Sequence, residues 1–442
     1  MSRIVAIAVL GATSLGVLPL EAAESAAGRT MGTSWSVIWH GGPIGSDEWP
    51  SAAVQDELRR LLERIDSLMS TWRDDSEVSR FNASRSTDWF EVSPETFRVV
   101  SRSLEVSAAS GGAFDVTVSR LIDLWGFGHK GKQRTPTDSE IETARHLAGW
   151  SKLELRADPL AIRKTEPLLT VNLSAIAKGY AVDCLGEFLE SVGVAGYLVE
   201  VGGETRLKGS RSDGADWRLG IEQPVAGRRR VRRVLPLSGP SRGVATSGDY
   251  RNRRQIGDRI VSHTIDPRTG RPVEHDLAAV TVVAADCMTA DALATTLMVL
   301  GPDDGIHYAK QNHIAALFFV HDGVGIREQS TVEYRALVSE PGEASAAVGW
   351  WSTWLPVLAL VLLAVLGLSV GVLLKGKMLV GSCGGLALLC SDRDDPQCGT
   401  CHVRGTGSDG EITGHADHPD HSDHSDQESS PESVMEGHRG SG

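Results

Sequence analysis

A carboxylate and a hydroxyl stand four residues apart in the segment 290–300. This segment has the pattern of a helix, so Asp291 and Thr295 are expected on one face of it. Two hard oxygen ligands suit Mg²⁺, with water and phosphate completing the coordination. The same spacing also fits an acidic residue that complements the dipole at a helix start. The pair is therefore a candidate metal site, and Asp291 is a candidate catalytic residue.

Three other segments carry residue types that could contact a ligand. Residues 111–117 (GGAFDVT) place a flexible turn beside Asp115, which can accept hydrogen bonds from a ligand. Residues 174–180 put Lys178 near an expected helix start, where a phosphate is favoured. His263 precedes a turn and could act as a base. Taken singly, each also fits an ordinary structural role: a turn, a helix cap or a buried histidine.

The composition excludes several classes of protein. The chain has 442 residues with 44 Lys and Arg against 57 Asp and Glu, a net charge of −13. Most of that negative charge lies in residues 391–442, which contain 12 Asp and Glu but only 3 Lys and Arg. A nucleic-acid partner is not indicated, because it requires clustered basic residues. No P-loop and no GxGxxG fingerprint is present, which disfavours ordinary kinases and dehydrogenases.

The elements that must position these residues mix helices and strands. Residues 52–68 and 95–107 show helical periodicity, the second with Ser93 as its cap and Pro94 at its start. Residues 198–201, 217–221, 279–284 and 315–320 read as strands. We predict an α+β fold with mixed, largely antiparallel sheets over residues 28–340.

Two apolar segments indicate export and membrane attachment. Residues 1–27 have a basic start, a short apolar stretch and small residues, the layout of a signal peptide. Residues 354–374 form a transmembrane helix candidate with tryptophans before it and Lys375 and Lys377 after it. This predicts a single pass through a bacterial inner membrane, with the larger domain periplasmic and the C-terminal tail cytoplasmic. Residues 341–353 would be a linker.

The ordered set of motifs resembles the ApbE family, the exported FAD:protein FMN transferases. The resemblance spans about residues 30–320 and rests on the following segments: Met31-Gly32-Thr33, 70–72 with 76–82, 113–117, 121–128 (LIDLWGFG), 173–183 (LSAIAKGYAVD), 201–204 (VGGE), 245–250, 263–270 and 290–301. It implies that FAD is cleaved at its pyrophosphate, that FMN is joined by a phosphoester to a Thr or Ser of a target protein, and that AMP leaves.

The resemblance also implies roles for particular residues. The FAD contacts would be Met31, Trp72, Ala113, Phe114, Asp115, Asn172, Lys178 and Ile265. The Mg²⁺ ligands would be the backbone oxygen of Ala175 and the side chains of Asp291 and Thr295. His263 would assist deprotonation of the acceptor hydroxyl. Two positions depart from the family pattern: Trp72 stands where Tyr is common, which keeps an aromatic face, and Asn172 stands where Asp is common, which removes a charge.

The tail carries a separate candidate metal site. Cys383, Cys390, Cys398 and Cys401 lie within 19 residues, and four thiolates can bind Zn²⁺ or iron. A redox pair at Cys398 and Cys401 is an alternative. The helix followed by SCGGL and these cysteines resembles NqrM, a membrane maturation factor of the Na⁺-translocating NADH:quinone reductase, over about residues 354–402. Residues 375–404 would form the NqrM-like Cys-rich segment. Residues 405–442 have the composition of a disordered acidic and histidine-rich tail.

Together these observations predict a Mg²⁺-dependent FAD:protein FMN transferase held in the membrane. Its partners would be FAD and an acceptor protein, with a subunit of the Na⁺-translocating NADH:quinone reductase as the expected target. Two alternatives stay open at this point. One is an FAD-binding protein or FAD pyrophosphatase, and the other is a metal-delivering assembly factor that acts through its Cys-rich tail.

Overall fold

The computed structural model describes residues 23–42, 49–128, 134–224, 230–249, 254–256 and 259–338. All of them fall in the first of two units, Met1–Trp351, and the second unit, Ser352–Gly442, lies outside the described residues. Among the described residues, no helix combines the length and apolar character needed to cross a membrane. The predicted signal peptide, membrane span and four tail cysteines all lie outside them and stay predictions.

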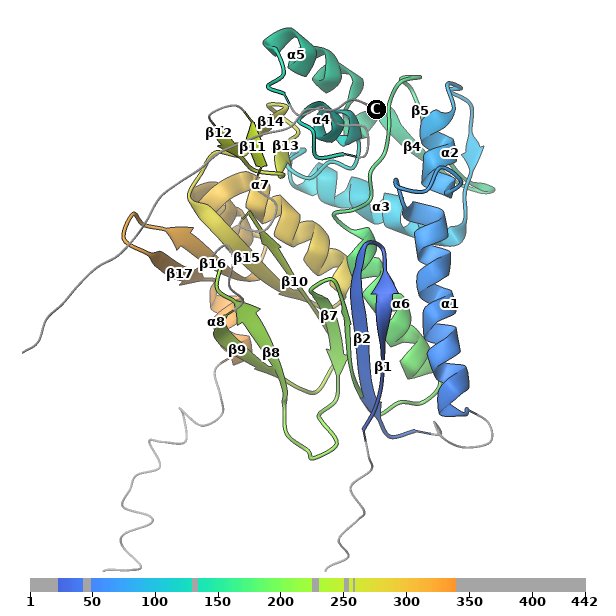
Figure 1. Cartoon of the computed structure of the whole chain (residues 1–442), viewed down its shortest axis with the longest axis vertical. Coiled ribbons are helices and arrows are strands. Elements are labelled where there is room, and N and C mark those ends of the chain that lie inside the picture. Colours follow the sequence, from blue (N-terminus) through green and yellow to red (C-terminus); the bar gives the residue numbers. More distant parts are fainter. Residues whose placement is uncertain are drawn as a thin grey trace, which may run out of the picture. The chain divides into compact units, whose positions relative to one another are not determined.

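The fold is built on one eight-stranded sheet, which confirms the predicted α+β class (Figure 1). Every neighbouring pair in it is antiparallel. The strand order is β1 (Glu24–Thr30), β2 (Thr33–His40), β6 (Gly196–Val201), β7 (Glu204–Lys208), β10 (Arg242–Gly248), β15 (Leu277–Ala284), β16 (Ala315–His321) and β17 (Ile326–Ser330). The predicted strands at 198–201, 279–284 and 315–320 are β6, β15 and β16.

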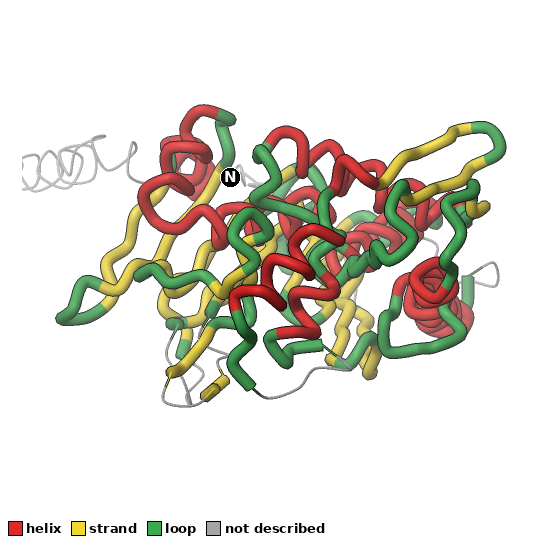
Figure 2. The backbone as a smooth tube through the Cα atoms, turned by 90° about the horizontal axis from the view of Figure 1, so that it is seen from above, coloured by secondary structure: helices red, strands yellow, loops and turns green. Residues whose placement is uncertain are grey.

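Four long helices supply the helical part of the core. They are α1 (Ser51–Met69), α3 (Pro94–Ala109), α6 (Ala177–Ser191) and α7 (Cys287–Gln311). One face of β2 and β6 packs into the same core as α1 and α6, through residues such as Trp35, Val37 and Val199. Seen from above, α1 is viewed end-on at the margin of the described fold (Figure 2). As predicted, Ser93 caps α3 and accepts a hydrogen bond from the amide of Thr96.

Helix α7 carries the predicted metal ligands and is longer than the sequence suggested. It begins at Cys287, where Asp286 caps it by accepting a hydrogen bond from the amide of Thr289. Its regular path is interrupted at Gly301, whose φ of 80° is not helical, and Pro302 follows. The predicted end at residue 300 therefore coincides with a real break, and a second helical stretch continues to Gln311. A side chain at Gly301 would collide with the ring of His275.

A two-stranded hairpin covers part of the opposite face of the sheet. It consists of β8 (Trp217–Glu222) and β9 (Val231–Leu237), and β8 matches the predicted strand at 217–221. Trp217, Ile221 and Leu235 pack with residues of β7, β10 and β16 in a separate apolar cluster. The short helix α8 (Val332–Val338) contributes to the same cluster.

Smaller elements complete the described fold around this frame. They are α2 (Glu77–Ala83), β3 (Phe90–Glu91), α4 (Ser119–Leu124), α5 (Asp138–Leu147), β4 (Leu153–Ala157), β5 (Leu160–Lys164), β11 (Arg254–Ile256), β12 (Arg259–Val261), β13 (Ile265–Asp266) and β14 (Arg271–Pro272). Leu121, Ile141 and Ile265 share a small apolar cluster, which joins α4 and α5 to the β13 segment.

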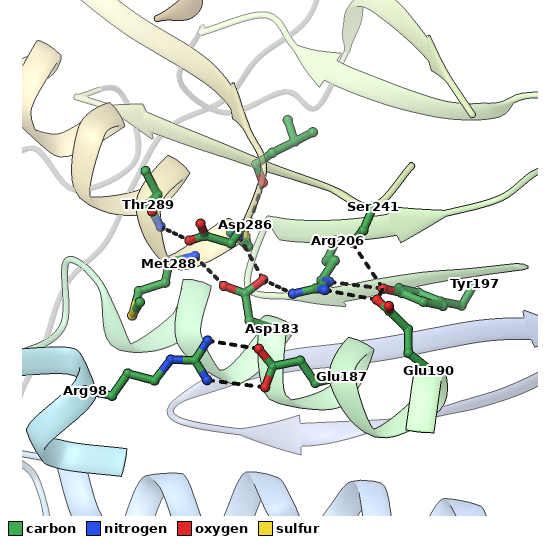
Figure 3. Close-up of polar contacts among 12 residues, drawn as sticks. Arg98, Asp183, Glu187, Glu190, Tyr197, Arg206, Ser241, Asp286, Met288 and Thr289 are labelled. Carbon is green, nitrogen blue, oxygen red and sulfur yellow. Dashed lines mark hydrogen bonds and ion pairs between the residues drawn. The ribbon is translucent and has the colours of Figure 1, made fainter. Parts of the chain in front are cut away.

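A buried polar network fixes α6 against the start of α7 (Figure 3). The Asp183 carboxylate accepts hydrogen bonds from the amides of Cys287 at 2.9 Å and Met288 at 2.8 Å. It also pairs with the Arg206 guanidinium on β7 at 2.9 Å, and Arg206 in turn contacts Glu190 and Tyr197. A carboxylate at a helix start satisfies amides that have no partner within the helix. The network thus sets the position of α7 relative to α6, which together carry the candidate site.

Candidate active site

A cavity of about 1140 Å³ lies where α6, α7 and the sheet meet. Ten of the sequence-predicted residues line it, although they come from segments spread over more than 180 residues. They are Ala113, Phe114, Asp115, Asn172, Ala175, Lys178, His263, Ile265, Asp291 and Thr295. The fold therefore brings together candidate residues from four separate segments, 113–115, 172–178, 263–265 and 291–295.

Two of the predicted FAD contacts are not part of the cavity wall. Met31 occupies the tight turn between β1 and β2, with a positive φ of 47°, and packs against the main apolar core. Trp72 follows α1 and is 66% exposed. Their roles stay predictions.

Lys178 is held between two buried carboxylates. Its Nζ lies 2.7 Å from Glu204 Oε1 and 3.7 Å from Asp291 Oδ2. Burial lowers the pKa of Lys178, but the attraction of Asp291 and Glu204 outweighs it, so the pKa is raised above its ordinary value and the ammonium stays charged. Burial raises the pKa of both Glu204 and Asp291, and Lys178 opposes that rise. The cavity wall thus holds one fixed positive charge between two acidic groups.

Asp291 is positioned by the neighbouring helix as well as by its own. The amide of Gly179 on α6 donates to Asp291 Oδ2 at 3.1 Å. In a regular helix this amide would donate to the carbonyl of Ala175, four residues earlier. Ala175 instead lies in the turn before α6, and among the described residues no backbone amide donates to its carbonyl oxygen. Gly179 must be glycine here, because a Cβ would lie 2.4 Å from the backbone oxygen of Cys287.

Hydroxyl groups continue this polar wall along α7 and β10. Thr295 lies one turn after Asp291 in α7, and its Oγ1 is 3.4 Å from Ser247 Oγ on β10. The preceding residue of β10, Thr246, contacts Thr281 of β15 at 2.8 Å between hydroxyl oxygens. Thr246, Ser247 and Thr295 all line the cavity. The predicted same-face placement of Asp291 and Thr295 is thus confirmed.

Asp115 organises its own loop. Its Oδ1 accepts hydrogen bonds from the amide and the hydroxyl of Thr117, both at 2.7 Å, and Oδ2 accepts from the amide of Trp150 at 2.9 Å. The turn before it depends on Gly111 and Gly112, whose φ values of 59° and 81° are positive. Burial raises the pKa of Asp115, and these hydrogen bonds offset part of the rise. The carboxylate therefore shapes the cavity edge formed by Ala113 and Phe114.

Asn172 and His263 line other parts of the cavity. The side-chain Oδ1 of Asn172 accepts a hydrogen bond from the backbone amide of Ser174 at 2.9 Å. The backbone amide of Asn172 donates to the backbone carbonyl of Val116 at 2.7 Å. The ring of His263 lies edge-on to Phe127, with 6.4 Å between ring centroids. Its Nδ1 is buried and has no hydrogen-bond partner among the described residues. Burial lowers the pKa of His263, Asp249 raises it and Lys178 lowers it, with a net fall below the ordinary histidine value.

Glu204 is the main site residue that the sequence argument did not single out. It ends the VGGE motif, which was used for the resemblance but assigned no role to its carboxylate. The two preceding glycines have positive φ values of 66° and 109°, a conformation that favours glycine. The Gly-Gly pair directly before Glu204 was therefore a sequence signal for a tight turn that fixes this carboxylate. Ser247 was likewise part of a quoted motif without an assigned role.

The donor set in the cavity is compatible with Mg²⁺. Asp291 offers a carboxylate, Thr295 a hydroxyl and Ala175 a carbonyl without a backbone donor, all on the cavity wall. Mg²⁺ is commonly held by one or two carboxylates together with phosphate and water. Within the part of the chain that the structure describes, no group of three or more His, Cys, Asp or Glu side chains could hold a metal ion. A magnesium ion here would thus rely on mixed oxygen ligands.

A half-buried lysine ammonium at a helix start, flanked by hard oxygen donors in a cavity, suits anionic, phosphate-bearing ligands. The chain belongs to the ApbE family, whose model matches residues 31–318.

Curated relatives and solved structures agree with this assignment. The FAD:protein FMN transferase of Vibrio cholerae is 40% identical over 314 residues, which cover 71% of this chain and 92% of that protein. The FAD:protein FMN transferase of Salmonella typhimurium is 36% identical over 323 residues, covering 72% and 91%. The structure of the flavin transferase ApbE from Vibrio cholerae matches with a TM-score of 0.65 and 40% identity, over 72% of this chain and 99% of that one. The apo flavinyl transferase ApbE of Pseudomonas stutzeri also has a TM-score of 0.65, at 38% identity, over 72% and 97%.

Proposed function

We propose that this chain is an FAD:protein FMN transferase and that the cavity described above is its active site. In the reaction, the hydroxyl oxygen of a Thr or Ser forms a bond to the phosphorus of the FMN half of FAD. The bond from that phosphorus to the bridging oxygen breaks, AMP leaves, and the hydroxyl proton passes to a base. The observation that carries the proposal is the charged Lys178, held between Glu204 and Asp291 in the wall of a cavity that ten predicted residues share.

Lys178 supplies fixed positive charge where a pyrophosphate would bind. It is the second residue of α6, so the amides of the first turn add partial positive charge beside it. Phosphoryl transfer depends mainly on positioning and on neutralising charge. Because Glu204 and Asp291 already fix the ammonium, little reorganisation is needed during the reaction.

We propose that Ala175, Asp291 and Thr295 hold Mg²⁺ at the same end of the cavity. When bound, Mg²⁺ would neutralise the charge that develops on the pyrophosphate oxygens. The Gly179 amide keeps Asp291 Oδ2 in place at 3.1 Å. Ala113, Phe114, Asp115, Asn172 and Ile265 would surround the flavin nucleotide, with the Asp115 hydrogen bonds holding the loop in its shape.

His263 is our candidate for the base that takes the hydroxyl proton. We expect His263→Gln to lower kcat about 100-fold or more, within the usual range for a general base. Because burial lowers the pKa of His263, its neutral form is favoured near neutral pH and is lost only as the pH falls through the lowered pKa. The wild-type rate should therefore fall on the acid side of neutrality, and the variant should lack this limb. His321→Gln, at an exposed position of β16, is the control. An acid limb that persists in the His263 variant would remove His263 from the role.

The direct test of the function is covalent flavin on protein. Membrane proteins from cells without this chain are incubated with FAD, Mg²⁺ and the purified chain, and then separated under denaturing conditions. We expect a fluorescent protein band that requires the chain and FAD. Absence of any such band, with FAD binding to the chain intact, would contradict the transferase assignment.

We further propose that the enzyme works on the periplasmic side, tethered by residues 354–374, and that a subunit of the Na⁺-translocating NADH:quinone reductase is its acceptor. The tryptophans and lysines that flank the apolar segment support this orientation, and the NqrM-like cysteines support a role in assembling the same complex. Replacing Cys383 and Cys390 by serine should impair that reductase while the flavin band remains. Loss of both together would argue against two separate roles.

A further inference from the structure

One end of the cavity carries none of the predicted FAD contacts. The predicted contacts come from residues 113–115, 172–178 and 265, and the end in question is lined by three strands instead. Its wall consists of Ser34 and Ile38 of β2, Leu198 and Glu200 of β6, and residues 217–222 of β8. Glu204 and Lys178 also line the cavity, so this end is continuous with the reaction site.

The floor of this end is a sheet face that is only partly covered. Along β2, Trp35, Val37 and Trp39 are buried toward α1 and α6, whereas the alternate residues face the other way and are more exposed. On that outer face, Ile38 is 38% exposed and pairs across the strands with the half-buried Leu198. The β8–β9 hairpin packs over β7, β10 and β16, and Leu198 packs against the same cluster, so the hairpin borders this floor.

One edge of β8, whose residues 217–222 line the cavity, has no strand partner among the described residues. Within the described residues, β8 pairs only with β9, in a two-stranded sheet. Arg218 lies opposite Pro236 in that pairing. Proline has no amide hydrogen, so this pair cannot be a hydrogen-bonded one, and the backbone amide and carbonyl of Arg218 must point away from β9. Backbone groups in a strand point to the same edge at every second residue, so the amide and carbonyl of Gly220 also point away from β9.

We propose that an extended segment of the acceptor protein adds to this open edge of β8, as a third strand lying over β2 and β6. The inference rests on the proposed function, because it concerns the second substrate of the same site. A segment in this place would form main-chain hydrogen bonds with Arg218 and Gly220. Every second side chain would pack on Ile38 and Leu198.

The position of the edge favours a protein segment as its occupant. Transfer to a protein requires that a piece of polypeptide reach the reaction site, and the groove leads to Lys178 and Glu204 within one cavity. An unpaired strand edge supplies alternating donors and acceptors that match another strand and require no particular side chains. An apolar floor at Ile38 and Leu198 beside Glu200 offers packing together with one charged contact. Side chains on the added strand would then select among acceptors.

The test compares two substitutions at one position. Arg218→Pro removes the backbone N–H that points away from β9, as well as the side chain. Arg218→Ala removes only the side chain and keeps that N–H. Both variants should bind FAD and unfold at temperatures close to the wild type. We expect the initial rate of covalent flavin appearance, on dilute membrane proteins from cells lacking the chain, to fall roughly tenfold further in the proline variant than in the alanine variant.

A second pair of variants tests the floor independently of the backbone. Ile38→Lys places a charge beneath the expected strand, and Ile260→Lys makes the same change at an exposed site outside the cavity. Only the first should slow transfer with FAD binding unchanged. The inference would be overturned if the two Arg218 variants transferred flavin at equal rates and Ile38→Lys transferred it as fast as Ile260→Lys. Flavin transfer by the wild type would still support the proposed function in that case. If Arg218→Pro instead abolished self-association of the chain and left flavin transfer intact, the edge would bind a second copy of the chain. That result would also overturn the inference.

Discussion

Replacing Asp291 by asparagine is expected to lower the rate of flavin transfer by about a thousandfold, or ~4 kcal/mol of transition-state stabilisation. Asparagine keeps the size of the side chain and can still accept the Gly179 amide hydrogen bond, so α6 and α7 should stay in place. What is lost is the negative charge that would bind Mg²⁺ and that helps to hold Lys178 at 3.7 Å. Initial rates of covalent flavin formation across a range of Mg²⁺ concentrations measure this effect.

The matched control is Asp303→Asn, on the same helix but at an exposed position outside the cavity. It should transfer flavin at the wild-type rate. The thermal unfolding of the Asp291 variant should also stay close to that of the wild type, because Lys178 keeps its closer ion pair with Glu204 at 2.7 Å and the side chain at position 291 keeps its hydrogen bond from Gly179. Transfer by Asp291→Asn within about threefold of the wild type would refute the metal-ligand role.

Replacing Asp183 by alanine is expected to cost about 3–5 kcal/mol of folding free energy, the range for removing one partner of a buried ion pair. The Asp183 side chain is only 1% exposed and satisfies the first amides of α7 as well as Arg206. Without it, the Arg206 guanidinium keeps only its contacts with Glu190 and Tyr197. Chemical denaturation of the wild type and the variant measures the difference.

The control for Asp183 lies one turn further along α6. Glu187 pairs with Arg98 at 2.9 Å, and both side chains are about half exposed, so Glu187→Ala should cost no more than about 1 kcal/mol (Figure 3). Asp183→Asn should fall between the two alanine variants, because an amide oxygen can still accept one backbone hydrogen bond. Similar losses for the Asp183 and Glu187 alanine variants would show that the buried network does not stabilise the α6–α7 junction.

Local patterns in the sequence were enough to predict several elements of the fold. The periodicity of residues 52–68 and the Ser93-Pro94 start correspond to α1 and α3, since both depend on neighbours close in the chain. The predicted end of a helix at residue 300 coincides with the end of the first stretch of α7, where Gly301 and Pro302 interrupt the helix. The order of the eight strands could not be predicted, since it depends on pairings such as β2 with β6, which are more than 150 residues apart.

The candidate site shows the same division. Asp291 and Thr295 were placed on one face by helical spacing alone, and Lys178 at a helix start, and the structure confirms both placements. The role of Glu204 was not predicted because it depends on an ion pair with Lys178, which lies 26 residues earlier in the chain. The open edge of β8 was also beyond the sequence, because an edge is defined by the strands that fail to pair with it.

The most direct measurement for the account as a whole is the balance of products from FAD. The purified chain is given FAD, Mg²⁺ and membrane proteins from cells lacking it, and AMP, free FMN and protein-bound FMN are quantified together. The account predicts one AMP released for each FMN bound to protein, with little free FMN. AMP accompanied by an equal amount of free FMN, with no flavin on protein, would show a pyrophosphatase and contradict the account.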